Sequence, residues 1–328
     1  MFSRRHLLST TAFGALSGCV LPPRVLMSSV RPLLIAHRGA SGALPEHTLA
    51  AYRLGASQGA DAIEPDLVMS KDGVLMARHD HYIGVSTNVS KLYPERRRTG
   101  SGVDTPEWFT EDFSSEEFAQ LRARQPWPKR DQSHNDEYGI ASFDEVLKLR
   151  AALESELGRV IYVYPELKLP SYFANLGLDP VPAYVDAWKA RSATVRSRIL
   201  TQCFETDTLR RLRAELGPKA KLTQLLPALK GDQVVEITID EIAHYADAIG
   251  AHKLALIDVN GRSTGLLEAA HARGLKVHVY TFRDDSLLAH YSSPETELQA
   301  FLALGVDGVF CDFPATARRV IDGLFGAS

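Results

Sequence analysis

Polar clusters follow several apolar runs of this sequence, and their side chains could together bind a cation and a phosphate. The clusters are His37-Arg38-Gly39, Glu64-Pro65-Asp66, His79-Asp80, Glu166-Leu167-Lys168 and Asp312. If the apolar runs are parallel strands of a barrel, their carboxyl ends meet at one face, where the catalytic residues of barrel enzymes lie. Three carboxylates, two imidazoles, a guanidinium and an ammonium would then share one site.

The acidic residues of these clusters predict a site for a divalent cation. Glu64 and Asp66 are separated by one residue, so on a strand both side chains point to the same face. With Glu166 from another strand they form an all-oxygen ligand set, which suits a hard cation such as Ca²⁺ or Mg²⁺ better than zinc. An acidic pair inside the apolar run AIEPDLV is costly to bury without a compensating charge, which also favours a metal.

The basic residues provide what hydrolysis of a phosphodiester requires. The two imidazoles of His37 and His79 titrate near neutral pH and could act as the general acid and the general base. Arg38 offers a planar fork to a phosphate and Lys168 a second positive charge. Glu46 could orient Arg38 or accept a hydrogen bond from a substrate hydroxyl, and both roles remain open.

The elements that must position these residues alternate between apolar runs and amphipathic segments, which is typical of a parallel sheet covered by helices. Strands are predicted over 33–36, 60–67, 74–77, 160–164, 198–202, 221–225, 255–258, 276–281 and 306–310, and helices over 48–58, 143–157, 181–190, 208–216, 239–246, 265–273 and 298–304. No Gly-x-Gly-x-x-Gly motif follows the first strand. We therefore predict an α/β fold, a TIM-type (β/α)8 barrel over residues 33–325.

One stretch, about 82–140, interrupts this alternation and is too long for an ordinary connection. We predict that it is a small insertion after the third strand, 74–77. Because it begins just after His79-Asp80, it could form a lid over the active-site mouth. A surface excursion without a catalytic part is the alternative.

The N-terminus resembles an export signal rather than part of the fold. Arg4 and Arg5 precede a short apolar segment, which fits a twin-arginine or general signal over 1–18, with 19–32 as a tether. Leu16-Ser17-Gly18-Cys19 resembles a lipobox, so Cys19 is predicted to carry a lipid anchor in the periplasm or cell envelope, the one membrane attachment that we expect. The formal net charge of −3 argues against a nucleic-acid partner.

Five segments occur in an order that resembles the bacterial glycerophosphodiester phosphodiesterases, and most closely the exported type. They are LIAHRGASGALPEHTLAAY, GADAIEPDLVMSKDGVLMARHDHY, YPELKLP, VHVYTFR and GVDGVFCDFPA. The resemblance implies a TIM-type barrel and hydrolysis of a small glycerophosphodiester to sn-glycerol 3-phosphate and an alcohol.

The same resemblance implies roles for the residues of the clusters. His37 and His79 would be the acid and base, and Arg38 and Lys168 the phosphate contacts. The metal ligands would be Glu64, Asp66 and Glu166, holding Ca²⁺ as in the exported type, with Mg²⁺ as the alternative.

Two other functions remain open from the sequence. His79-x-His81 could be the metal pair of a zinc amidohydrolase-type barrel, although that family places such a pair in its first strand. The chain could also be a surface lipoprotein that uses the barrel to bind a partner. The intact set of candidate catalytic residues argues against that second alternative.

Overall fold

The computed structural model describes residues 30–100, 102–227, 237–258 and 261–327. The predicted signal over 1–18, the predicted anchor Cys19 and most of the tether lie outside these ranges. Within them, no helix combines the length and the apolar character needed to cross a membrane.

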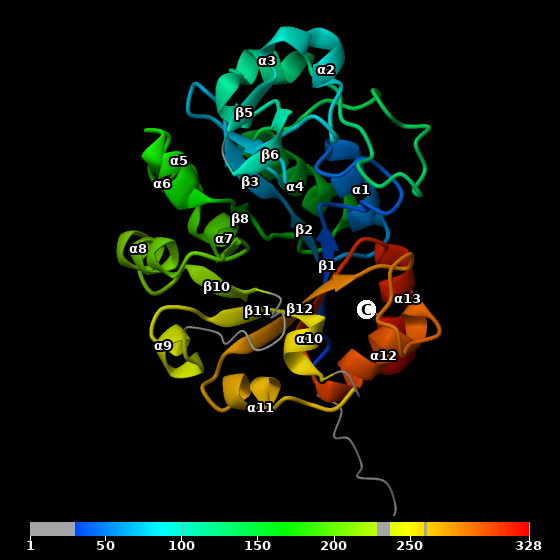
Figure 1. The fold of residues 1–328 in the computed structure, drawn as a ribbon. Coiled ribbons are helices and arrows are strands. Elements are labelled where there is room, and N and C mark those ends of the chain that lie inside the picture. Colours follow the sequence, from blue (N-terminus) through cyan, green and yellow to red (C-terminus); the bar gives the residue numbers. More distant parts are fainter. Residues whose placement is uncertain (1–29, 101, 228–236, 259–260, 328) are drawn as a thin grey trace, which may run out of the picture.

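Parallel strands form a barrel with helices on its outer side (Figure 1). The strands are β1 (Leu33–His37), β2 (Ala62–Glu64), β3 (Asp66–Met69), β7 (Tyr162–Val163), β8 (Glu166–Leu167), β9 (Leu200–Cys203), β10 (Lys221–Leu226), β11 (Ala248–His252), β12 (Lys276–Phe282) and β13 (Gly308–Cys311). The ring closes because β1 pairs with both β13 and β2, while β2 pairs with β7 and β3 with β8. This pairing, with β8 to β13 bonded in order, confirms the predicted TIM-type barrel.

Two barrel strands are each interrupted by a proline, and this is why the ring of eight strands appears as ten segments. Pro65 separates β2 from β3, and Pro165 separates β7 from β8. A proline has no N–H to donate, but its carbonyl oxygen still accepts. Glu166 N donates to Pro65 O and Gln202 N to Pro165 O, each at 2.9 Å, so the ladder continues past both prolines.

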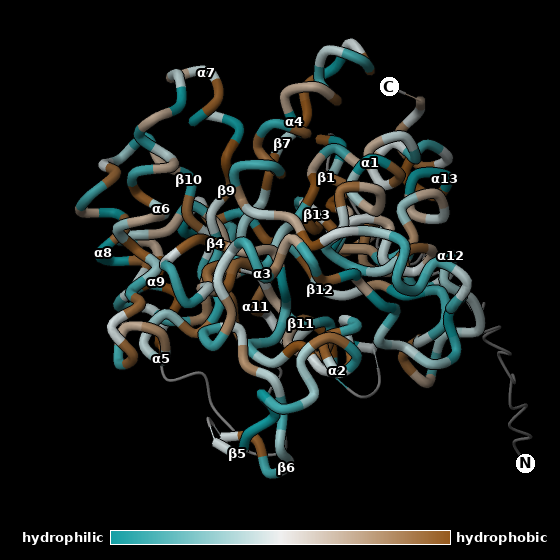
Figure 2. Tube along the Cα trace, turned by 90° about the horizontal axis from the view of Figure 1, so that it is seen from above, coloured by the Kyte–Doolittle hydropathy of each residue, from teal (hydrophilic) through white to brown (hydrophobic). Residues whose placement is uncertain are grey.

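Helices follow most of the strands, and apolar residues concentrate on the strands and on the helix faces turned toward them (Figure 2). The helices outside the insertion are α1 (Leu49–Ser57), α4 (Phe143–Leu157), α5 (Pro170–Asn175), α6 (Pro180–Lys189), α7 (Ala193–Arg196), α8 (Thr206–Leu216), α9 (Ile239–Ala243), α10 (Lys253–Leu256), α11 (Leu266–His271), α12 (Pro294–Leu304) and α13 (Pro314–Phe325). Each predicted helix overlaps one of these. Helix α4, for example, begins at a capping box of Ser142 and Glu145 and ends at Gly158, whose φ is 63°.

Two strand predictions were wrong in ways that bear on the site. The segment 74–77 forms β4 (Leu75–Ala77), which pairs antiparallel with β3 and is therefore not a barrel strand. The predicted strand 255–258 overlaps helix α10, and the actual strand β11 precedes it. Gly250 makes β11 resemble a loop in the sequence, yet a Cβ there would lie 2.4 Å from Leu225 Cδ2, so close strand packing favours the glycine.

The insertion follows β4 and thus connects the second and third strands of the barrel. It contains α2 (Val89–Leu92), η1 (Pro94–Arg96), β5 (Arg98–Gly100), β6 (Val103–Glu107), η2 (Thr110–Asp112) and α3 (Ser115–Gln120). Its elements lie together beside the barrel (Figure 1), and the β5–β6 hairpin projects beyond the rest of the chain (Figure 2). Phe109, Phe113 and Phe118 are completely buried, so the insertion packs as an ordered lobe rather than as an exposed excursion.

Candidate active site

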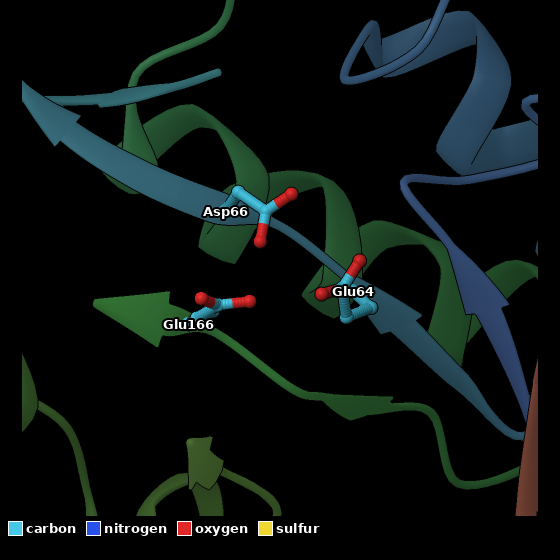
Figure 3. A group of neighbouring side chains, drawn as sticks. All are labelled: Glu64, Asp66 and Glu166. Carbon is cyan, nitrogen blue, oxygen red and sulfur yellow. The ribbon is translucent and has the colours of Figure 1, made fainter. Parts of the chain in front are cut away.

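Three buried carboxylates meet at the carboxyl ends of the second and third barrel strands. Glu64 ends β2, Asp66 begins β3 and Glu166 begins β8, and Asp66 and Glu166 are direct partners in the parallel ladder. One oxygen of each lies within 4.8 Å of the others. Figure 3 shows the three side chains directed toward a common space. The three carboxylates thus lie close enough together to bind one cation, as the sequence predicts.

The surroundings of these carboxylates fit a divalent cation. Burial, followed by the charges of Asp66 and Glu166, raises the pKa of Glu64 well above its usual value. Burial also raises the pKa of Glu166 to about 8, although the nearby Lys168 acts in the opposite direction. Asp66 Oδ1 is buried and accepts no hydrogen bond, although Lys168 Nζ lies 4.0 Å away. A hard cation would relieve this repulsion and occupy the unbonded oxygen.

Arg38 and Lys168 place two positive charges beside the carboxylates. Arg38 Nη1 donates to Glu46 Oε2 at 2.9 Å, and its Nε lies 3.4 Å from Asp66 Oδ2. Lys168 Nζ lies 2.9 Å from Glu166 Oε1. Burial alone would raise the pKa of Glu46, but the charge of Arg38 lowers it to about 2. Glu46 therefore holds Arg38 as an ionised partner, which is one of its two predicted roles.

The backbone of Arg38 also serves the site. Its φ of 58° is in the left-handed region, which is uncommon for a residue with a side chain. In this conformation its N–H donates to Glu64 Oε2 at 2.8 Å. Such strain is typical of functional sites, where surrounding contacts maintain it.

Each candidate catalytic histidine has a carboxylate on its Nδ1. His37 Nδ1 lies 2.6 Å from Asp312 Oδ1, and His79 Nδ1 lies 2.8 Å from Asp80 Oδ1. A carboxylate on Nδ1 favours the neutral tautomer with its proton there, so that Nε2 is the nitrogen able to accept a proton. Burial and then Arg38 lower the pKa of His37 to about 4, despite Asp312. Burial, Arg38 and Lys168 also lower the pKa of His79.

His79 reaches the site by a different route from the one predicted. We expected it at the carboxyl end of a parallel barrel strand, but it follows the antiparallel β4. This strand returns toward the mouth, and Arg78 N donates to Asp66 O at 3.0 Å. The hairpin of β3 and β4 therefore brings His79 back beside the carboxylates.

Seven of the eight predicted site residues line one cavity of about 190 Å³: His37, Arg38, Glu64, Asp66, His79, Glu166 and Lys168. The eighth, Glu46, does not line the cavity and contacts Arg38. One cavity thus brings together both candidate catalytic imidazoles, the two predicted phosphate contacts and the three carboxylates of the predicted cation site.

Comparison with known proteins agrees with this geometry. Residues 37–316 match the model of the glycerophosphoryl diester phosphodiesterase family. The chain belongs to this family. It is 33% identical to a glycerophosphodiester phosphodiesterase of Arabidopsis thaliana, over 89% of this chain and 87% of that protein. It is 27% identical to one of Haemophilus influenzae, over 97% and 98% of the two chains.

Solved structures of family members share the fold. A phosphodiesterase of Oleispira antarctica, in complex with the product sn-glycerol-3-phosphate, matches with a TM-score of 0.63 and 21% identity, over 89% of this chain and 97% of that one. A glycerophosphodiester phosphodiesterase of Parabacteroides distasonis matches with a TM-score of 0.61 and 16% identity, over 90% and 98%. The family resemblance of the sequence is confirmed.

Five other side chains complete much of the cavity wall: Gln202, Phe204, His252, Tyr280 and Arg283. Phe204 and Tyr280 lie near the ends of predicted strands and could be expected at the wall from the sequence, whereas Gln202, His252 and Arg283 were not singled out. Gln202 ends its predicted strand and Arg283 follows another, so their positions carried the same signal as the named clusters. His252 was missed because its strand β11 was missed.

The zinc alternative is not supported by the position of His81. Its ring centroid lies 5.6 Å from that of Phe109 and 4.8 Å from that of Tyr172, in an aromatic cluster that does not line the cavity. Among the described residues, the group able to hold a metal is Glu64, Asp66 and Glu166. A His79–His81 metal pair would require another arrangement.

Proposed function

We propose that this protein hydrolyses glycerophosphodiesters to sn-glycerol 3-phosphate and an alcohol. The observation that carries the proposal is one cavity that brings together the carboxylates of Glu64, Asp66 and Glu166, the positive charges of Arg38 and Lys168, and two imidazoles that each contact a carboxylate. Membership of the glycerophosphoryl diester phosphodiesterase family supports it, as does the product in the Oleispira antarctica relative.

Arg38 and Lys168 would bind the phosphate. Burial acts to lower the pKa of Lys168, but Glu166 and Asp66 together raise it above its usual value. Glu46 and Asp66 likewise raise the pKa of Arg38 against the effect of burial. Both side chains therefore keep their positive charge at neutral pH, which is what an anionic phosphodiester requires for close approach of a nucleophile.

His37 and His79 would transfer the protons. The neutral ring of one accepts the proton of the attacking hydroxyl through Nε2, and the other, in the fraction of the protein in which that ring carries a proton, donates it to the oxygen of the leaving alcohol. Asp312 and Asp80 stabilise a charge that develops on the respective ring. The attacking hydroxyl is water or the 2-hydroxyl of the glycerol moiety, and both fit the same pair of histidines.

Glu64, Asp66 and Glu166 would hold the divalent cation, and we propose Ca²⁺, with Mg²⁺ as the alternative. When bound, the cation supplies positive charge that stabilises the negative charge of the phosphate in the transition state. The all-oxygen ligand set and the resemblance to the exported type support this assignment.

One assay tests the activity and the cation together. Glycerophosphocholine, glycerophosphoethanolamine and glycerophosphoglycerol are incubated with the protein in EDTA, then with Ca²⁺ or Mg²⁺ restored, and sn-glycerol 3-phosphate is measured. We expect no release in EDTA and release with the restored cation. If no diester is hydrolysed with either cation, the proposed function is wrong.

Substitution of the histidines tests their role. We expect His37→Ala and His79→Ala each to lower kcat by about 10²–10⁴-fold, the usual contribution of a general acid or base. His134 is a matched control because its Nδ1 also lies 2.7 Å from a carboxylate, that of Glu137, but it is not part of the cavity. His134→Ala should retain the activity, and equal activity of all three variants would contradict the assignment.

We also propose that the protein resides in the periplasm or cell envelope, attached through a lipid on Cys19. The motif Leu16-Ser17-Gly18-Cys19 supports this. Cells expressing Cys19→Ser should release into the soluble fraction an enzyme that otherwise sediments with membranes. Unchanged sedimentation of the variant would contradict the anchor.

A further inference from the structure

The insertion contributes one buried side chain, Arg130, to the back of the active site. Its side chain is 2% exposed. Its Nη2 donates to Asp312 Oδ2 at 2.7 Å, and its Nε donates to Asp285 Oδ2 at 2.7 Å. Its Nη1 donates to the carbonyl oxygen of Ser41 at 3.2 Å. The guanidinium thus joins the insertion to three loops, which follow the barrel strands β1, β12 and β13.

Arg130 and His37 contact opposite oxygens of the same carboxylate. His37 Nδ1 lies 2.6 Å from Asp312 Oδ1, while Arg130 binds Oδ2. Arg283 Nε also donates to Oδ2, at 3.0 Å. With Oδ2 bound by two guanidinium groups, the carboxylate plane cannot rotate, and Oδ1 stays directed at the imidazole.

A second connection runs through the backbone beside His37. Ser41 Oγ donates to the carbonyl oxygen of His37 at 2.8 Å. The carbonyl oxygen of Ser41 accepts from Arg130 and also from Gln125 Nε2, at 3.0 Å. Both donors belong to the insertion, so it supports the main chain of His37 as well as the carboxylate that orients its ring.

We propose that Arg130 is a positioning residue for His37 and that it acts through Asp312, which makes the insertion part of the active site. The proposal rests on the role of His37 in the proposed function. Loss of Arg130 leaves Asp312 with the side chain of Arg283 alone on Oδ2, so the ring of His37 is held less firmly. Because Arg130 does not line the substrate cavity, kcat should fall while KM changes little.

The test compares Arg130→Ala with Arg124→Ala. Arg124 lies in the same lobe and its Nε is 3.1 Å from Asp136 Oδ1, and neither of these two residues lines the cavity. With glycerophosphocholine and Ca²⁺, we expect Arg130→Ala to lower kcat by about 10- to 100-fold, with KM within about 3-fold of the wild type, as for a small misplacement of a catalytic group. Arg124→Ala should match the wild type in both constants.

A chemical rescue separates positioning from a structural role. Low millimolar guanidinium can occupy the space left by the truncated side chain, and we expect it to restore part of the kcat of Arg130→Ala without affecting Arg124→Ala. The Ca²⁺-induced rise in melting temperature of Arg130→Ala should equal that of the wild type. An equal rise would mean that the three carboxylates of the predicted cation site are still in place.

The outcomes distinguish this inference from the proposed function. If the wild type hydrolyses the substrate and Arg130→Ala keeps its kcat within about 2-fold, Arg130 only attaches the lobe to the barrel and the inference is overturned. A wild type without activity would instead overturn the proposed function. Should Arg130→Ala fail to fold, Arg130→Lys carries the test with the same criteria, since a lysine keeps the charge but cannot bind Asp312 and Asp285 as a fork.

Discussion

Glu64 would bind a metal ion through its charged carboxylate, whereas the folded protein without a metal favours the neutral form of this side chain. Burial and the charges of Asp66 and Glu166 raise its pKa well above the usual value, so without a cation the charged form of its side chain is disfavoured. We therefore expect Glu64→Gln, an uncharged substitute of the same shape, to melt near the wild-type temperature in EDTA. The variant should lose the stabilisation by Ca²⁺, which for the wild type is about 2.7 kcal/mol at 100 times Kd. Thermal unfolding with and without Ca²⁺ measures both effects.

The exposed carboxylate of Glu156, which pairs with Arg53, provides the control for this substitution. Glu156→Gln should keep the full Ca²⁺-dependent rise in melting temperature. A Glu64→Gln protein that responds to Ca²⁺ as the wild type does would show that the cation binds elsewhere.

The candidate metal ligands, phosphate contacts and acid/base residues were predictable, whereas part of the cavity wall and the residues that hold the site in place were not. His37, Arg38, Glu64 and Lys168 stand out because charged side chains at the ends of apolar runs have no structural reason to be there. Arg130 carries no such signal, since it lies in an irregular stretch with many other arginines. Its burial arises from contacts with Asp312 and Asp285, more than 150 residues away in the sequence.

At the scale of elements, β11 shows how a tertiary contact overrides local sequence preference. The sequence AIGAH reads poorly as a strand because glycine is unfavourable there. A Cβ on Gly250 would lie 2.4 Å from Leu225 Cδ2 of the neighbouring β10, so any larger residue would force the Leu225 side chain to move. We expect Gly250→Ala to destabilise the fold by about 1–3 kcal/mol, the usual range for overpacking a core.

Chemical denaturation measures this change, and Gly323 provides a control of opposite sign. Gly323 lies within α13, and nothing is within 4 Å of a Cβ built there. Gly323→Ala should stabilise by up to about 1 kcal/mol, because alanine is the better helix former. If Gly250→Ala is as stable as the wild type, Leu225 moves aside freely and the packing argument fails.

At the scale of the whole molecule, the alternation of apolar and amphipathic segments was sufficient to predict a barrel, but not how its ring closes. Closure depends on β2 and β3 acting as one strand, and on β7 and β8 doing the same. Nine strands were predicted for a ring of eight, because the antiparallel β4 was counted as a barrel strand and the segment 255–258 was predicted in place of the missed β11. Pairing between strands distant in the sequence leaves no periodic signal by which such an exchange could be detected.

The closed barrel also encloses a histidine whose protonation opposes folding. His278 of β12 is 5% exposed, and its Nδ1 lies 2.7 Å from the hydroxyl of Tyr164, which in turn is 2.6 Å from Thr223 Oγ1. Burial lowers the pKa of His278 to about 4. As the pH falls below about 6.5, the unfolded chain binds a proton there that the folded protein does not, so stability decreases. The full stabilisation is present above pH 6.5 and is lost by about pH 4.

We therefore expect the free energy of unfolding of the wild type to fall with decreasing pH. The free energy of unfolding of His278→Gln should fall less steeply, and the two slopes should differ by about 1.4 kcal/mol per pH unit between pH 6 and pH 4. Denaturant titrations at successive pH values, in EDTA so that cation binding does not contribute, give both slopes. The variant is expected to be less stable at every neutral pH, because the contact with Tyr164 changes, so the difference in slope and not the absolute stability is the readout. Above pH 7 the two curves should run parallel. Equal slopes below pH 6 would mean that the folded barrel admits the proton at His278 as readily as the unfolded chain does, and that the ring is not enclosed in solution.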